Sequence, residues 1–440
     1  MTMARWPRWV WVLLFVGLAV RLAWGLSRPA DASALSALPD QLEYLQLARS
    51  LLAGEGLVLT DPRFPGPVYA YRTPGYPLFV AALGGSVPAV RVGQALLDML
   101  TAAVVYAVAR RWSPSGAGVA LAAVVLNPLL IHHTSLVLTE TLFTSMLTVG
   151  VALLLSPPGA GRGVRGELKW LAGAAVLAAS VLVRPGAIAL PLLLCVASAW
   201  ARPQPLRVPP AACAVVLTLL TLLPWAYRNH RVLGTWVWTT TNAGITAYDG
   251  WNPDATGASD QGGFVAQMPH LALLSETQRN AYLLELARAF REEQPARVPG
   301  LLWAKLTRTW SPAPAAAPDR PWTQLAAAWA YAAVVWPLAV IGVLLPVKTS
   351  GPAPAARPSD APTLSVKVLL LLPPVYFTAA ALLTVGSVRY RLPAEPMLAL
   401  LAGLGWVVVS RWLLEARPSM GAGSRSAASE QASRRPQGDA

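Results

Sequence analysis

Charged residues are scarce in this chain of 440 residues, of which only 13% are Asp, Glu, Lys or Arg. A soluble globular protein has about 25%. The deficit excludes an ordinary cytosolic enzyme, because too few charges are present to cover a water-facing surface. An apolar content of 55% also excludes a disordered chain. Cysteine is nearly absent, and because Cys195 and Cys213 both lie in apolar runs, neither a disulfide framework nor a metal cluster is indicated.

Several sequence motifs of soluble enzymes are also missing. The chain has no Walker A loop, no GxSxG nucleophile elbow, no HExxH pair and no GxGxxG that opens a helix after a strand. A cytosolic enzyme that consumes nucleotides is therefore not expected. No internal repeat is found, so an inverted-repeat transporter has no positive support.

Long apolar runs are abundant instead, and roughly 20 apolar residues span a bilayer. They predict an all-α polytopic membrane protein with about ten transmembrane helices. The first run could also be a signal peptide, but the many runs that follow and Arg21 within it favour a helix. The predicted spans are 9–26, 90–109, 116–130, 136–155, 168–183, 187–201, 208–227, 322–346, 366–385 and 393–412.

Basic residues outnumber acidic ones and give a formal net charge of +14. Their short clusters fall on alternate sides of the predicted spans, which is the pattern of cytoplasmic loops. We therefore expect a multi-pass protein of the cytoplasmic membrane with both termini in the cytoplasm. The excess charge is topological and gives no case for nucleic acid.

The same pattern divides the chain into four parts. A membrane module covers 1–227 and includes a first outer loop at 27–74, and a second outer segment covers 228–321. C-terminal transmembrane helices follow at 322–416, and a tail occupies 417–440. Within the second outer segment, residues 276–293 are expected to form a helix with Tyr282, Leu286 and Ala289 on one face. Residues 350–362 resemble a cytoplasmic linker.

Asp40 and Glu43 are the main candidates for chemistry in the first outer loop. They precede an amphipathic stretch and follow Pro39, so one interpretation is a capping box with Asp40 as N-cap and Glu43 three residues on. The other is a carboxylate at the outer membrane surface that takes a proton from a hydroxyl. Both remain open.

Glu140 lies inside an apolar run, and an intramembrane carboxylate is a functional candidate by default. The alternative is a glutamate that is hydrogen-bonded to its threonine neighbours, Thr139 or Thr141. In the segment from Tyr71 to Pro77, two prolines and a glycine indicate a rigid entry into the membrane, and Arg72 could bind a lipid phosphate or simply anchor the interface.

Arginines also recur at the outer ends of predicted helices, against the positive-inside trend. An anionic partner such as a lipid-linked phosphate would explain them, whereas snorkelling to headgroups is the alternative. These arginines are Arg184, Arg228, Arg389 and Arg391.

The order of several short motifs resembles the GT-C superfamily of membrane glycosyltransferases, in particular the bacterial family 39-like group. That group is related to dolichyl-phosphate-mannose–protein mannosyltransferases and to the lipid A aminoarabinose transferase. The resemblance runs from Asp40 to Leu400. It rests on Asp40…Tyr44…Ala48-Arg49, Tyr71-Arg72-Thr73-Pro74-Gly75-Tyr76-Pro77, Asn127-Pro128…Thr139-Glu140, Arg184-Pro185, Pro224-Trp225…Arg228-Asn229, Asn252-Pro253 and Arg389-Tyr390-Arg391-Leu392-Pro393…Glu395-Pro396.

The resemblance implies a GT-C-type bundle with an outer-face loop domain. It also implies transfer of a hexose or pentose from a polyprenyl-phosphate donor to a glycan, lipid or protein hydroxyl. Asp40 matches the family's base, with Glu43 as the runner-up, and Glu140 would orient the acceptor or Asp40. Arg72, Arg228, Arg389 and Arg391 would bind the donor phosphate. The expected substrate contacts are Tyr44, Tyr71 and Asn252.

The sequence assigns no cofactor, and a divalent metal stays open, although no residue pattern indicates one. One departure concerns Gln41, since mannosyltransferases that act on proteins often carry paired acids in this loop; protein O-mannosylation is therefore not supported. The alternative function is a transporter or flippase for a lipid-linked anion, which the outer arginines and Glu140 would also suit.

Overall fold

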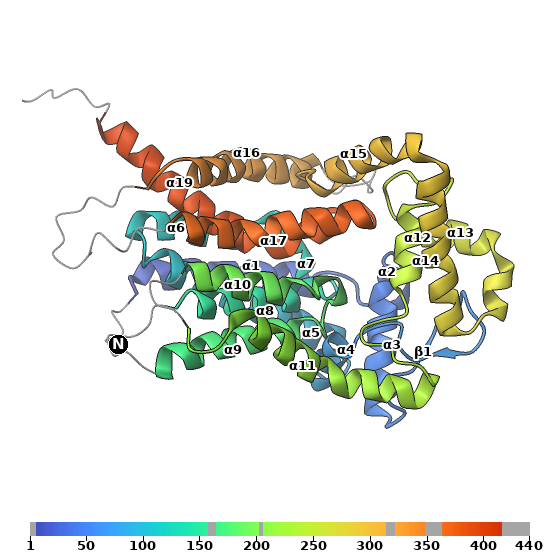
Figure 1. Cartoon of the computed structure of the whole chain (residues 1–440). Helices are drawn as coiled ribbons and strands as arrows, with labels where there is room; N and C mark the ends of the chain where they lie inside the picture. The colour runs from blue at the N-terminus through green and yellow to red at the C-terminus, as the bar shows by residue number, and fades with distance from the viewer. Residues whose placement is uncertain (1–5, 157–163, 202–205, 314–321, 348–362, 416–440) are drawn as a thin grey trace, which may run out of the picture.

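The computed structural model describes residues 6–156, 164–201, 206–313, 322–347 and 363–415 (Figure 1). The predicted tail at 417–440 and linker at 350–362 lie outside these ranges. Within them, apolar helices pack side by side into a bundle, and shorter helices gather at one end of it (Figure 1). The bundle consists of α1 (Arg8–Leu26), α5 (Val87–Ala109), α6 (Pro114–Val125), α8 (Glu140–Leu154), α9 (Val164–Ser180), α10 (Leu190–Trp200), α11 (Pro210–Leu233), α16 (Trp322–Leu344), α17 (Leu364–Leu383) and α19 (Glu395–Glu415).

Among the described helices, six are long and apolar enough to cross a membrane, so the chain is a multi-pass membrane protein. These are α1, α5, α11, α16, α17 and the segment Val388–Glu415, which contains α19. Shorter apolar helices accompany them at Pro114–Val125, Glu140–Leu154 and Pro185–Trp200. The expected total of about ten spans stays a prediction, because a helix of 12 to 15 residues is short for the hydrocarbon core.

Small residues let the central helices approach closely. A Cβ at Gly405 of α19 would overlap the carbonyl oxygen of Leu338 in α16, and a Cβ at Gly342 would overlap that of Leu401. Gly116 of α6 and Gly403 of α19 meet in the same way on the other side of α19. Such contacts are typical of helix packing in membranes, where association depends on close van der Waals contact.

A buried ion pair joins α1 to α5 within the bundle. Arg21 Nε donates to Asp98 Oδ2 at 2.5 Å, and both side chains are almost fully buried. The guanidinium also donates to the carbonyl oxygens of Val124 and Val125, which end α6. The arginine inside the first apolar run is therefore satisfied within the bundle, as a charge in such a place must be.

The short helices at one end form a layer with its own apolar core, here named the outer layer after the two predicted outer segments that supply it (Figure 1). Phe64, Val68 and Tyr71 from the first outer loop pack there with Leu283 and Phe290 from the second outer segment. The layer contains α2 (Ala32–Ser36), α3 (Asp40–Leu52), the antiparallel pair β1 (Leu59–Thr60) and β2 (Pro67–Val68), α12 (Ala243–Gly250), α13 (Gln261–Gln267), α14 (Glu276–Glu293) and α15 (Val298–Thr309). Three shorter helices stand next to bundle helices in the chain: α4 (Gly75–Ala82) precedes α5, α7 (Pro128–His133) lies between α6 and α8, and α18 (Val388–Arg391) lies between α17 and α19.

The predicted helix over 276–293 is confirmed as α14. Its fully buried side chains are Arg279, Leu283, Ala287 and Phe290, and Tyr282 and Leu286 of the predicted face pack against the same core while partly buried. Arg279 takes a core position because its guanidinium lies over the Phe64 ring at 3.5 Å.

Candidate functional site

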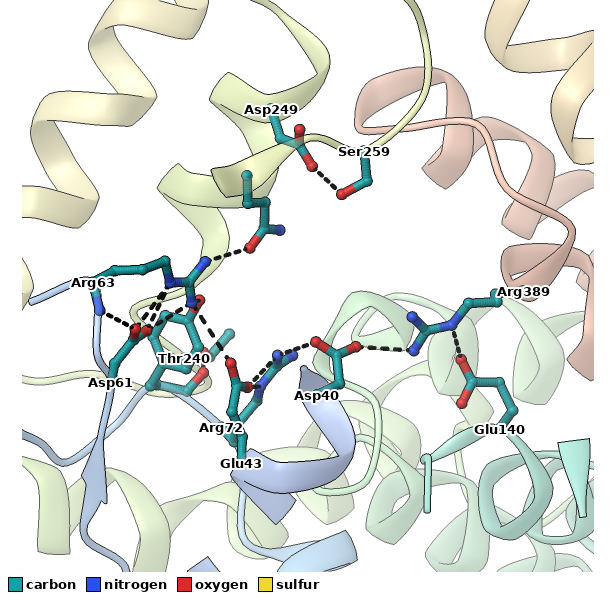
Figure 2. Close-up of polar contacts among 12 residues, drawn as sticks. Asp40, Glu43, Asp61, Arg63, Arg72, Glu140, Thr240, Asp249, Ser259 and Arg389 are labelled. Atoms are coloured by element: carbon teal, nitrogen blue, oxygen red, sulfur yellow. Dashed lines mark hydrogen bonds and ion pairs between the residues drawn. The ribbon is translucent and has the colours of Figure 1, made fainter. Parts of the chain in front are cut away.

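A row of alternating charges crosses the junction between the outer layer and the bundle, with Asp40 at its centre (Figure 2). Arg72 Nη2 donates to Asp40 Oδ1 at 2.7 Å, and Arg389 Nη2 donates to Asp40 Oδ2 at 3.0 Å. Asp40 comes from α3, Arg72 from the loop before α4, and Arg389 from α18. Three segments far apart in sequence thus meet at one carboxylate.

The row continues on both sides of Asp40. Arg72 also donates to Glu43 Oε2, from Nε at 2.8 Å and from Nη2 at 2.5 Å. Arg389 Nε donates to Glu140 Oε1 at 2.8 Å, and Arg184 Nη1 lies 3.4 Å from the same oxygen. Three carboxylates therefore alternate with three guanidinium groups, and their formal charges cancel.

The capping interpretation of Asp40 is wrong. Asp40 is the first residue of α3, the N-cap is Pro39, and no side chain caps this helix. Glu43 follows three residues later, so both carboxylates lie on one face of α3, where Arg72 bridges them.

Glu140 lies at a helix start rather than within a span. The apolar run predicted over 136–155 becomes helical only at α8, because residues 134–139 form turns after α7. A carboxylate at a helix N-terminus interacts favourably with the helix dipole. Its partners are Arg389 and Arg184 rather than the neighbouring threonines.

Aromatic rings line the Arg72 side of the row. The guanidinium carbon of Arg72 lies 5.3 Å from the Tyr44 ring centroid and 5.1 Å from that of Tyr71. Tyr44 in turn packs edge-on against Tyr76. Both predicted substrate tyrosines are thus beside Arg72, although each is more than nine-tenths buried.

Gly75 brings the Arg72 loop close to the Arg184 loop. Its N–H donates to the carbonyl oxygen of Leu182 at 2.9 Å, and a Cβ at this position would lie only 2.7 Å from that oxygen. A side chain would push the two loops apart. The close approach of these two loops therefore requires glycine at position 75, within the segment for which the sequence predicts a rigid conformation.

The environments of the two α3 carboxylates differ. Burial opposes ionisation of Asp40, but Arg72 and Arg389 outweigh it and hold the pKa of Asp40 well below its ordinary value. At Glu43, burial and the negative charge of Asp40 raise the pKa above its ordinary value, against the opposing effect of Arg72. Asp40 is thus kept as a carboxylate in the unliganded site.

The structure places Arg228 outside the row of charges. It holds backbone of the first outer loop, since Nη1 donates to Tyr69 O at 2.6 Å and Nη2 donates to Leu57 O at 2.7 Å.

Arg391 is placed in a separate buried network. It donates to Glu395 at 2.9 Å and to the carbonyl oxygens of Thr309 and Ser311, and only 2% of its surface is exposed. Its location ties α18 to α19 and to the end of α15, with the guanidinium buried among them.

Asn252 also lies apart from the row. Its amide donates to the carbonyl oxygens of Tyr248 and Asp249 and accepts from the N–H of Asp254. These hydrogen bonds close the turn after α12.

The sequence reading missed a second ion pair next to Glu43. Arg63 Nη2 lies 2.6 Å from Asp61 Oδ2 and 3.6 Å from Glu43 Oε1, and it donates to the Tyr71 hydroxyl at 2.7 Å (Figure 2). The i, i+2 spacing of Asp61 and Arg63 in a loop carries no signal that would single them out. Across the described ranges, no group of three or more His, Cys, Asp or Glu side chains is arranged to hold a metal ion.

An apolar groove opens between α10 and α11 close to the Arg184 loop. Ile188, the first residue that lines it, follows Arg184 by four positions. The hydroxyl of Tyr376 in α17 donates to Gly186 O at 2.8 Å and so fixes the turn between the two. The groove is lined by Ile188, Ala189, Leu192, Ala214, Val215, Thr218, Leu219, Leu222 and Trp238.

No protein-family model matches the chain, and no curated protein matches it in sequence. Among solved structures, it is similar to the archaeal oligosaccharyltransferase AglB from Archaeoglobus fulgidus in complex with an inhibitory peptide and a dolichol-phosphate. The identity is 11% and the TM-score 0.51 over 98% of this chain and 53% of that one, so the chain spans about half the length of AglB. Another match is ArnT from Cupriavidus metallidurans bound to undecaprenyl phosphate, with 15% identity, a TM-score of 0.39 and coverage of 92% and 78%. The likeness to AglB shows that this chain shares the fold of a helical membrane protein over 98% of its length, in line with the predicted all-α polytopic bundle.

Proposed function

We propose that this protein is a membrane glycosyltransferase that moves a sugar from a polyprenyl-phosphate donor to a hydroxyl acceptor at the outer membrane surface. The observation that carries the proposal is Asp40 held between Arg72 and Arg389 at the edge of an apolar bundle. One carboxylate and two guanidinium groups are the groups that such a transfer requires.

The reaction needs a base for the acceptor and cations for the leaving group. The acceptor oxygen forms a bond to the anomeric carbon while its proton passes to Asp40. The bond from that carbon to the phosphate oxygen breaks, and its electron pair leaves with the polyprenyl phosphate. Arg72 and Arg389 stabilise the growing negative charge on that phosphate, so the departing group needs no proton.

The donor itself releases Asp40 for this role. The row of charges is neutral without a ligand, so an incoming phosphodiester competes with the carboxylates for the arginine N–H groups. As Arg72 and Arg389 turn to the phosphate, they stop lowering the pKa of Asp40, which becomes a better proton acceptor. Meanwhile Arg72 keeps its hydrogen bond to Glu43 and Arg389 keeps its hydrogen bond to Glu140, so both arginines stay in place.

The groove between α10 and α11 suits the hydrocarbon chain of the donor. Its lining is almost wholly apolar, and it begins four residues from Arg184. A polyprenyl chain lying there would bring its phosphate to the Arg184 end of the row. Arg228, Arg391 and Asn252 have no direct part in this arrangement, and we assign them structural roles.

The proposal is tested by Asp40→Asn in purified protein supplied with a polyprenyl-phosphate sugar and hydroxyl acceptors. Loss of the base should lower the rate of transfer by about 100-fold or more. Glu55→Gln is the matched control, because Glu55 is an exposed acid of the same loop. Full activity in Asp40→Asn would overturn the role of Asp40, and transbilayer movement of the lipid without transfer would favour a flippase instead.

A further inference from the structure

The backbone immediately before Arg72 is held by Arg228 in the last turns of α11 and by residues of the second outer segment. The carbonyl oxygen of Tyr69 accepts from Arg228, and that of Ala70 accepts from the N–H of Thr241 at 2.9 Å. The carbonyl oxygen of Tyr71 accepts from the Thr240 hydroxyl. Because buried backbone groups need partners, these bonds fix the path of the loop.

Glu276 supplies two further bonds to this backbone. Its Oε2 accepts from the N–H of Tyr69 at 2.7 Å, and its Oε1 accepts from the N–H of Ala70 at 2.9 Å. Oε1 also accepts from the Thr241 hydroxyl at 2.5 Å. One carboxylate therefore clamps two consecutive amides of the first outer loop and a side chain of the second outer segment.

This carboxylate is not needed by its own helix. Glu276 is the first residue of α14, but Ser275 and Gln278 form the capping box there. The Glu276 side chain instead points across to the loop that ends in Arg72. A charged acceptor makes hydrogen bonds about twice as strong as a neutral one.

We infer that Glu276 is a positioning residue that holds Arg72 in register with Asp40 and Glu43 by clamping the amides of Tyr69 and Ala70. Arg72 follows Ala70 by two residues, and its bonds to both carboxylates depend on where this loop lies. The second outer segment would thereby govern how firmly the site grips the donor phosphate. The expected effect of Glu276 on sugar transfer rests on the proposed function, whereas its effect on the position of the Arg72 loop does not.

Glu276→Gln tests the clamp with little change in shape. In this variant an NH₂ group replaces one carboxylate oxygen of Glu276. The NH₂ group is a hydrogen-bond donor and faces a backbone N–H, which is also a donor, so one bond of the clamp is lost. We expect kcat/KM for the donor to fall by about 10- to 100-fold, as for a lost hydrogen bond to a charged group. Glu292→Gln on the same helix is the control, because Glu292 is exposed and pairs with exposed Arg288; its kcat/KM should stay unchanged.

A double-mutant cycle with Arg72→Gln separates positioning from general damage. If Glu276 acts through Arg72, adding Glu276→Gln to Arg72→Gln lowers the remaining activity by less than twofold. The full 10- to 100-fold loss in both backgrounds would overturn the inference.

Amide hydrogen exchange tests the clamp independently of sugar transfer. The amides of Tyr69 and Ala70 should exchange faster in Glu276→Gln than in Glu292→Gln, while those of α19 stay protected in both. Unchanged exchange at these amides would overturn the inference. Faster exchange together with a wild-type protein that transfers no sugar would instead refute the proposed function and leave the clamp standing.

Discussion

Asp40 has its two carboxylate oxygens on two different arginines, and this single residue connects segments more than 300 positions apart. At the residue scale, the chemistry of such a site depends on what competes for each guanidinium N–H. Arginine is better suited than lysine to this place, because its planar fork can bind two carboxylates or one phosphate with the same donors.

Lys305 differs from these arginines, because its buried amine contacts a carbonyl oxygen and an aromatic ring rather than a carboxylate. Its amine is fully buried, lies 3.3 Å from the Trp251 ring centroid and reaches only the carbonyl oxygen of Leu382 at 3.4 Å. Burial and the nearby Arg291 lower the pKa of Lys305 to about 7, although Asp249 acts in the other direction.

Lys305 should therefore make stability depend on pH. Between about pH 7 and pH 10 the unfolded lysine binds a proton that the folded one does not, so the unfolding temperature should rise with pH across this window. In Lys305→Met this rise should disappear, and the variant should be the more stable protein at pH 6. Thermal unfolding in detergent measures both effects.

Lys169→Met provides the comparison, because Lys169 is an exposed lysine of α9. It should keep the pH dependence of the wild type. Equal slopes in Lys305→Met and Lys169→Met would contradict the assignment.

At the scale of whole elements, glycines allow α19 to pack closely between two neighbouring helices. It packs against α6 through Gly403 and against α16 through Gly405, so its backbone approaches both neighbours. Because α19 follows directly from α18, this packing also sets where Arg389 enters the row of charges.

Gly405→Ala should lower the stability of the bundle, because the added Cβ would overlap the Leu338 carbonyl oxygen. Overpacking of this kind costs about 1–3 kcal/mol. In Gly300→Ala the new Cβ meets nothing within 4 Å, so this helical position should be neutral or slightly stabilised. The unfolding temperatures of the two variants in detergent measure the difference. Equal unfolding temperatures would show that the α16–α19 contact can relax around the added methyl group.

At the scale of the whole molecule, the sequence allows the fold class and most helix positions to be predicted, and it draws attention to the charged residues that the structure brings together around Asp40. Apolar runs and the motif around Asp40 depend on local composition, which a sequence displays directly. The roles of Arg228 and Arg391 could not be predicted, because an arginine at a helix end looks the same whether it binds a phosphate or backbone carbonyls. Glu276 was missed for a similar reason, since an acid in the first turn of a helix is ordinary.

The topology predicts which residues share a face of the membrane. In a variant without Cys195 and Cys213, cysteines at Glu55 and Glu292 should react with a membrane-impermeant maleimide from the outer side. A cysteine at Glu415, at the far end of α19, should react only from the inner side, because α19 runs away from the outer layer (Figure 1). Labelling of Glu292→Cys and Glu415→Cys from one side would contradict this arrangement.

The buried pair of Arg21 and Asp98 has a consequence for how the chain is made. The two residues are separated by 77 positions, so α1 emerges from the ribosome with a charged residue in the second half of its apolar run and no counterion. An arginine within the hydrocarbon core is costly unless it is paired. The ion pair that satisfies Arg21 can therefore form only after α5 has been synthesised.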